Sequence, residues 1–314
     1  MKRWQVFSFL FSIIAIQSSF EVGGFYEMDS KTLGKKLFFD PILSSDSSIS
    51  CASCHNPQFG FADNKAFSLG VGGKPTSRNT PSVLNMKNRT AFFWDGRASS
   101  LEEQALGPIS NPDEMNLPIP IAIQRLKNHP FYSKAFKEVF GKEVDSLTLG
   151  KALAAFEKTL EIEETRMDLY LMGNENALNE SEKRGLELFN GKAKCIECHF
   201  GPDFTNDQFK NIGLFSGNKN EDLGRYLVTK NKKDKGKFKV PGLRNVIYTA
   251  PYMHDGRFKT LEEVIDYYNN PDIANPKHKN RDKLIKTLNL TSDEKKDLIN
   301  FLKSASTEKP FTNY

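Results

Sequence analysis

Apolar residues recur at helical spacing in four segments of the chain. The segments 31–40 ("KTLGKKLFFD") and 181–195 ("SEKRGLELFNGKAKC") each carry a Leu-Phe pair near the helix end, as expected for a helix that packs one face on a core. Residues 147–162 and 290–306 show the same period. Ser181 is predicted to cap the second of these helices, and Thr291 or Ser292 the last.

Long stretches rich in Pro, Gly and Asn separate the predicted helices, notably 68–90 and 107–121. Loops of this length are uncommon in compact domains unless they are functional or pack on something large. Runs that alternate apolar and polar residues are few, so little β-structure is expected. The pattern therefore predicts a mostly α fold with long loops.

The length of 314 residues suits about two domains, and the pattern predicts domains at 21–165 and 166–314. Residues 1–20 have Lys2 and Arg3 followed by an apolar run, which is typical of a signal peptide and too short for a stable membrane span. An uncleaved N-terminal anchor is the alternative. Export to the periplasm is expected.

The net charge of +5 is mild, and no basic helix with interleaved aromatic residues indicates a nucleic-acid partner. The run "KNKKDKGKFK" at 230–239 is the most basic stretch. It is expected to be a solvated loop, with the steering of an acidic redox partner as the alternative.

All four cysteines lie in two C-x-x-C-H motifs, "CASCH" at 51–55 and "CIECH" at 195–199. A zinc site would leave the histidine after each pair unexplained, a thioredoxin-like pair needs a βαβ context, and disulfides between such close neighbours are strained. Covalent attachment of c-type haem uses every residue of the motif. The predicted attachment and ligand residues are Cys51, Cys54 and His55 for one haem, and Cys195, Cys198 and His199 for the other.

The chain resembles the bacterial di-haem cytochrome c peroxidases and the related methylamine-utilisation enzymes that mature a tryptophan tryptophylquinone cofactor. The resemblance rests on "LGKKLFFDPILSSDSSISCASCHNP", "RNTPSVLN", "FFWDGRASSLEEQALGPI", "NPDEM", "CIECH" and "VPGLRNVIYTAPYMHDGRFKTLEEVIDYY". It implies two cytochrome c-like haem domains. The N-terminal haem would react with hydrogen peroxide, and the C-terminal haem would take electrons from a small donor protein, a cytochrome c or a cupredoxin.

The resemblance also assigns roles to residues of the first domain. Glu114 in "NPDEM" matches the acid beside the peroxide-reactive iron, Gln104 a pocket glutamine, and Trp94 a tryptophan between the haems. Glu114 as a surface glutamate and Trp94 as a core aromatic residue are the structural alternatives. Many relatives place a resting iron ligand where this chain has Val71, so we expect the first iron to be open to peroxide.

The sixth ligand of the second haem is expected to be Tyr268. In the peroxidases a methionine lies fourteen residues after the histidine of the "PYMHDG" element, and that count from His254 reaches Tyr268. A helix from about Thr260 turns Tyr267 away by about 100°. A core tyrosine is the alternative, and Met253 is expected to be a packing residue.

The resemblance further implies a calcium ion held by Asn79 and the carbonyls of Thr249 and Pro251, and it allows a homodimer. Three functions remain to be compared: peroxide reduction, oxidation of a partner protein during quinone cofactor maturation, and electron carriage without catalysis. An electron carrier would leave Glu114 and Gln104 without a task.

Overall fold

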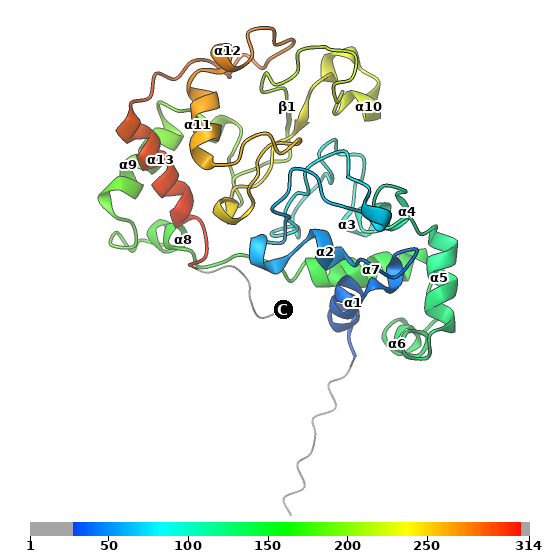
Figure 1. Cartoon of the computed structure of the whole chain (residues 1–314). Helices are drawn as coiled ribbons and strands as arrows, with labels where there is room; N and C mark the ends of the chain where they lie inside the picture. The colour runs from blue at the N-terminus through cyan, green and yellow to red at the C-terminus, as the bar shows by residue number, and fades with distance from the viewer. Residues whose placement is uncertain (1–27, 309–314) are drawn as a thin grey trace, which may run out of the picture.

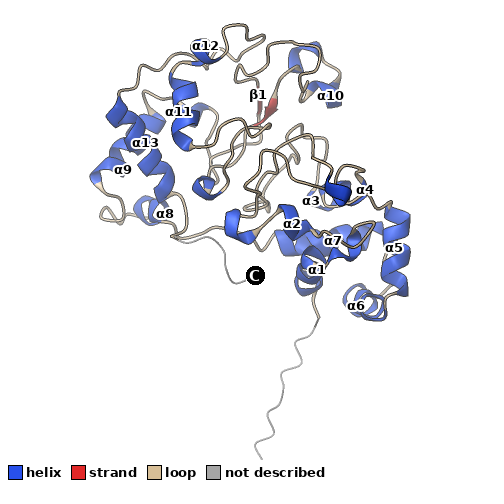
Figure 2. Cartoon of the chain, in the orientation of Figure 1, coloured by secondary structure: helices blue, strands red, loops and turns tan. Residues whose placement is uncertain are grey.

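The computed structural model describes residues 28–308, so the predicted signal peptide at 1–20 lies outside the described residues. The chain folds into two mostly helical lobes (Figure 1). Figure 2 shows that the longer helices lie toward the outside of the two lobes, whereas loops fill the region between them. The expectation of a mostly α fold with long loops is confirmed.

The N-terminal lobe is built around two long helices that cross, α1 and α7. Its helices are α1 (Ser30–Phe39), α2 (Cys51–Cys54), α3 (Leu101–Gln104), α4 (Gly107–Ser110), α5 (Ile119–Asn128), α6 (Pro130–Phe140) and α7 (Ser146–Glu157), with 3-10 turns η1 (Pro41–Leu43), η2 (Pro57–Phe59) and η3 (Val71–Gly73).

The C-terminal lobe repeats this plan with α9 and α13. Its helices are α8 (Arg166–Leu171), α9 (Glu180–Asn190), α10 (Tyr226–Thr229), α11 (Leu261–Asn269), α12 (Pro271–Ala274) and α13 (Ser292–Ser304), with 3-10 turns η4 (Cys195–Glu197), η5 (Lys232–Asp234) and η6 (Val246–Tyr248). The strands β1 (Phe209–Lys210) and β2 (Phe238–Lys239) form a short antiparallel pair.

Side-chain caps fix where these helices begin. Thr291 caps α13 in a capping box with Glu294, which confirms one of the two residues expected there. At α9 the expected cap was wrong: Asn179 accepts the N–H of Glu182, and Ser181 lies inside the first turn. The hydroxyl of Ser181 instead donates to Asp297 of α13 (2.5 Å), so the helix pair uses it as a tertiary contact.

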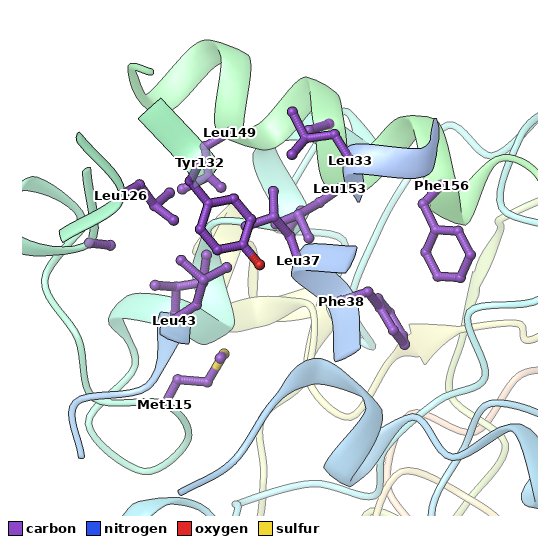
Figure 3. Close-up of a cluster of buried hydrophobic side chains, with 14 of the residues drawn as sticks. Leu33, Leu37, Phe38, Leu43, Met115, Leu126, Tyr132, Leu149, Leu153 and Phe156 are labelled. Carbon is purple, nitrogen blue, oxygen red and sulfur yellow. The ribbon is translucent and has the colours of Figure 1, made fainter. Parts of the chain in front are cut away.

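Each lobe has its own hydrophobic core. In the first, Leu33, Leu37 and Phe38 of α1 pack against Leu149 and Leu153 of α7, and none of them is more than 1 % exposed (Figure 3). The second core joins Phe189 of α9 to Phe301 of α13, with ring centroids 5.1 Å apart.

The two helix pairs cross at equivalent glycines, because each crossing brings a helix surface directly against a backbone carbonyl. A Cβ on Gly34 would lie 1.9 Å from the Ala152 carbonyl oxygen, and one on Gly185 would lie 2.1 Å from that of Asp297. Neither position tolerates a side chain without separating the helices.

A direct repeat relates the two lobes and was not recognised in the sequence. Residues 92–98 ("FFWDGRA") and 252–258 ("YMHDGRF") are offset by 160 positions, and each is followed three residues later by "LEE". Both segments close with an antiparallel bridge, Phe92 to Ala98 and Tyr252 to Phe258. The repeat therefore places Trp94 and His254 at equivalent positions.

The repeated segments meet between the lobes in a reciprocal pair of hydrogen bonds. The Asn79 N–H donates to the His254 carbonyl (2.8 Å), and the N–H of Lys239, 160 positions after Asn79, donates to the Trp94 carbonyl (2.7 Å). Arg78 adds a bidentate bond to Asp222 of the second lobe (2.6 and 2.9 Å). The two lobes are thus joined through the residues that surround Trp94.

Within residues 28–308, no helix has the length and apolar character needed to cross a membrane.

The crossing geometry leads to a stability prediction. Gly185→Ala should lower the free energy of unfolding by about 2 kcal/mol, since overpacking at a close contact costs ~1–3 kcal/mol. Glu187→Ala, on the exposed side of the same helix, should change it by less than about 0.5 kcal/mol. Chemical denaturation followed by circular dichroism measures both, and equal effects would show that the crossing does not limit stability.

Candidate active site

Both C-x-x-C-H motifs form one tight helical turn that ends on the histidine. The His55 N–H donates to the Cys51 carbonyl and the His199 N–H to the Cys195 carbonyl, each at 2.9 Å. All four cysteines are free thiols. Burial raises the pKa of Cys51 and of Cys195 to about 12, so these thiols stay protonated unless they react or bind.

The two imidazoles are oriented in the same way. Nδ1 of His55 lies 3.1 Å from the Phe61 carbonyl oxygen, and Nδ1 of His199 lies 2.9 Å from that of Phe204. Burial lowers the pKa of both histidines, so each ring is neutral, with the proton on Nδ1. Nε2 is then left with its lone pair free, which is the arrangement of a histidine metal ligand.

Each motif faces its own cavity. The first has a volume of about 500 Å³ and the second of about 300 Å³. The second is lined largely by apolar side chains, among them Phe189, Leu261, Ile265, Leu298 and Leu302. Paired thiols, a neutral imidazole and an apolar enclosure match the chemistry of a covalently held haem.

Glu114 and Gln104 both line the first cavity, together with His55. Oε1 of Glu114 accepts a hydrogen bond from Asn111 Nδ2 (2.8 Å), and burial raises the pKa of the carboxyl. Burial thus favours the protonated form of this acid relative to an exposed glutamate. Glu114 is therefore placed in the cavity and not on the open surface.

The loop around Val71 supports the backbone of this acid. The Val71 N–H donates to the Glu114 carbonyl (2.8 Å). A Cβ on Gly70 would lie 2.2 Å from the Asp113 carbonyl oxygen and 2.6 Å from that of Glu114. Gly70 lines the first cavity and Val71 does not, so the loop holds the acid's backbone without placing the Val71 side chain in the cavity.

A second carboxyl in the first cavity was missed by the sequence analysis. Glu157, at the end of α7, is 5 % exposed and lines the cavity, and its Oε2 has no hydrogen-bond partner in the described chain. Burial, with Glu102 adding repulsion, raises its pKa to about 8. Its apolar helix gave no sign that this glutamate would face inward.

Trp94 lines both cavities. Its indole N–H donates to the Asn79 carbonyl (2.8 Å), and its ring meets His254 edge-on at 6.5 Å. His254 in turn stacks on Phe238 at 3.7 Å. The three rings therefore follow one another along the second cavity, and Trp94 also lines the first.

Tyr268 and Tyr267 point in different directions from α11. Tyr268 lines the second cavity with Cys195, Cys198 and His199, and its hydroxyl forms no hydrogen bond to the described residues. The Tyr267 hydroxyl donates to the Ile212 carbonyl (2.7 Å), and the side chain is 3 % exposed. Burial raises the pKa of Tyr268, so its phenol keeps its proton unless a cation lies against it.

The three residues expected around calcium all line the second cavity where it meets the first lobe: Asn79, Thr249 and Pro251. Nδ2 of Asn79 donates to the Lys65 carbonyl (3.0 Å), which leaves its Oδ1 without a partner among the described residues. Met253 lines the same cavity.

Comparisons with known proteins agree on one family. Residues 29–176 match the family model described as di-haem cytochrome c peroxidase. The chain is 42 % identical to the methylamine utilization protein MauG of Methylorubrum extorquens, over 88 % of this chain and 78 % of that protein. It is 44 % identical to the cytochrome c551 peroxidase of Nitrosomonas europaea, over 76 % of this chain and 72 % of that protein.

Solved structures show the same fold. A MauG-like protein associated with microbial copper homeostasis superposes with a TM-score of 0.81 and 32 % identity, over 90 % of this chain and 91 % of that one. The diheme peroxidase BthA of Burkholderia thailandensis, at 24 % identity, has a TM-score of 0.77 over 89 % and 86 % of the two chains.

The unpaired Glu157 carboxyl leads to a pH-dependent prediction. Its folded pKa of about 8 lies above the unfolded value of 4.5, so its contribution to stability is complete below pH 4.5 and is lost as the pH rises through 8. Between pH 5 and 9 the holoprotein should therefore lose on the order of 3 kcal/mol relative to Glu157→Gln.

Thermal denaturation at several pH values measures this difference. Glu138→Gln, which removes an exposed carboxyl from α6, should follow the native pH dependence. If Glu157→Gln also followed the native pH dependence, ionisation of Glu157 would not be the cause of that dependence.

Proposed function

The chain belongs to the di-haem cytochrome c peroxidase family, and we propose that it is an exported enzyme that reduces hydrogen peroxide to water with electrons from a small redox protein. The observation that carries this proposal is the first cavity, where a neutral histidine and the protonatable carboxyl of Glu114 face the same space. An electron carrier has no need of that carboxyl.

Two covalent haems are part of the proposal. Cys51 and Cys54 would hold the first by thioether bonds and His55 would bind its iron, and Cys195, Cys198 and His199 would hold the second in the same way. When bound, the haems supply the redox-active iron on which electron transfer to peroxide depends.

The reaction consumes one peroxide, two electrons and two protons and yields two waters. Cleavage of the O–O bond needs a proton to leave one peroxide oxygen and reach the other, so that the departing oxygen leaves as water. The Glu114 carboxyl performs this transfer. Nδ2 of Asn111 donates a hydrogen bond to Oε1 of Glu114 (2.8 Å). Gln104, which lines the same cavity, orients the bound peroxide.

Divergence of the repeat explains why the two cavities differ. By the offset of 160 residues, Tyr268 of the second lobe corresponds to Pro108 of the first, and each lines its own cavity. Tyrosine offers a phenol oxygen to iron, and proline offers no side-chain donor. On this proposal the first site would be open to peroxide, Tyr268 and His199 would hold the iron of the second haem, and Trp94 would carry electrons between the two sites.

A second candidate function is the oxidation of a partner protein's residues during quinone cofactor maturation. The observation in its favour is Tyr268, since a tyrosine at this position is the pattern of the quinone-maturing enzymes. The MauG protein of Methylorubrum extorquens is 42 % identical to this chain. The electrons would then come from the bound protein. Peroxide consumption that needs a reduced donor supports the first function, and consumption at the expense of a bound protein supports the second.

The proposal includes a calcium ion between the lobes, with Asn79 Oδ1 and the carbonyls of Thr249 and Pro251 as its protein ligands. A hard cation with few protein oxygens and several waters suits such a site. A homodimer and a periplasmic location, after removal of residues 1–20, complete the proposal.

Glu114→Gln tests the catalytic step. The variant keeps the shape of the side chain and loses the transferable proton, so peroxide turnover should fall about 10²- to 10⁴-fold while both haem spectra remain. Asp113→Asn, at the exposed neighbouring carboxyl, should retain native turnover. Steady-state assays with a reduced donor give both rates, and a near-native rate for Glu114→Gln would remove this residue from the mechanism.

Tyr268→Phe and Tyr267→Phe form a matched pair for the second site. Only Tyr268→Phe should change the spectrum of the second haem, and it should raise that haem's reduction potential because an anionic ligand is lost. Tyr267→Phe should leave both unchanged. Intact mass spectrometry provides the control, with two haems retained in each variant. The charge-transfer band of a methionine ligand in the native protein would exclude Tyr268 as a ligand of the second haem, and Met253 would then be the candidate.

A further inference from the structure

Five lysines from three separate segments surround one groove on the second lobe. The groove has a volume of about 610 Å³ and is lined by Lys219, Lys232, Lys233, Lys235 and Lys279, with Phe215 and Gly217 among its other lining residues. The basic run 230–239 contributes only three of the five. Folding therefore assembles a charge cluster that the sequence does not show as one.

No carboxylate neutralises these lysines. None of the five forms an ion pair within the described residues, whereas two other lysines of the same run do: Lys237 pairs with Asp234 (2.9 Å) and Lys239 with Asp207 (3.5 Å). Glu221, in the neighbouring loop, is engaged by the backbone N–H groups of residues 216–218. Lys232, Lys233 and Lys235 of the run therefore line the groove without an ion pair, whereas Lys230 lies outside the groove and donates to the Leu227 carbonyl (2.7 Å).

Only a thin wall separates the groove from the second cavity. Phe215 and Lys235 line the groove, and their chain neighbours Leu214 and Gly236 line the cavity. A Cβ on Gly236 would lie 2.4 Å from the Phe215 side chain, so no side chain fits between them. Asn211 holds the wall together by donating to the carbonyls of Lys235 (3.2 Å) and Lys279 (2.8 Å).

We propose that this groove is the docking surface for the acidic face of a small electron-donor protein. The inference rests on the proposed function and adds the charge of the donor and the place where it binds. Unpaired lysines attract an acidic partner over several ångströms and raise its association rate, and the thin wall brings the donor close to the second cavity, where an electron must enter. Lys219 and Lys279 lie outside the basic run, so a solvated loop at 230–239 does not by itself account for their position beside the groove.

The test follows reduction of the oxidised holoprotein by a reduced small cytochrome c of net negative charge, in a stopped-flow instrument at low and high salt. For the native protein the second-order rate constant should fall as salt rises. Lys219→Glu/Lys233→Glu should lower it at least about 10-fold at low salt and flatten the salt dependence. Lys219→Gln/Lys233→Gln should give an intermediate rate.

Lys134→Glu/Lys151→Glu is the matched control. It makes the same change in net charge at two exposed lysines of the first lobe that form no ion pair among the described residues, and it should alter the rate constant by less than about 2-fold. Equal losses in the two Glu pairs, or none in the groove variants, would overturn the proposal. Binding of inorganic phosphate to the groove with no effect on cytochrome reduction would overturn it too.

Oxidation of the pre-reduced holoprotein by hydrogen peroxide, without any donor protein, is measured separately. Its failure would contradict the peroxidase proposal and leave the docking result to stand by itself. If peroxide oxidises the holoprotein but the groove charges do not affect its reduction by the cytochrome, only the docking surface is contradicted.

Discussion

The reciprocal hydrogen bonds between the lobes are the constraint on which the rest of the structure depends. Asn79 bonds to the His254 carbonyl and Lys239 to the Trp94 carbonyl, so each repeated segment is held by the other lobe. Backbone bonds of this kind fix position within a few tenths of an ångström. They place Trp94 in the wall of both cavities.

The two lobes share one architecture around two different cavities. In both, a tight turn presents two thiols and an imidazole whose Nδ1 faces a carbonyl oxygen, and in both a glycine lets the principal helices cross. The differences lie at a few positions. Pro108 corresponds to Tyr268 and Trp94 corresponds to His254, so the side chains that line the two cavities differ without a change in fold.

Buried carboxyls give the first cavity a chemistry that the second lacks. Glu114 has one hydrogen-bond partner and Glu157 has an oxygen with none among the described residues, and burial raises the pKa of both carboxyls. An unpaired buried acid destabilises the fold when it ionises. Proteins commonly concentrate such perturbed groups where protons must be moved, and the apolar α1–α7 core beside the cavity offsets the cost.

The sequence by itself determined the helical class, the turn that presents each haem motif and the direction of Tyr268, because these depend on local spacing along one helix or one loop. It also identified Glu114, although only through resemblance. Three features depended on tertiary structure: the inward position of Glu157, the reciprocal bonds at Asn79 and the grouping of Lys219 and Lys279 with the basic run. Each arises where segments far apart in the chain meet, and periodicity carries no information about such contacts.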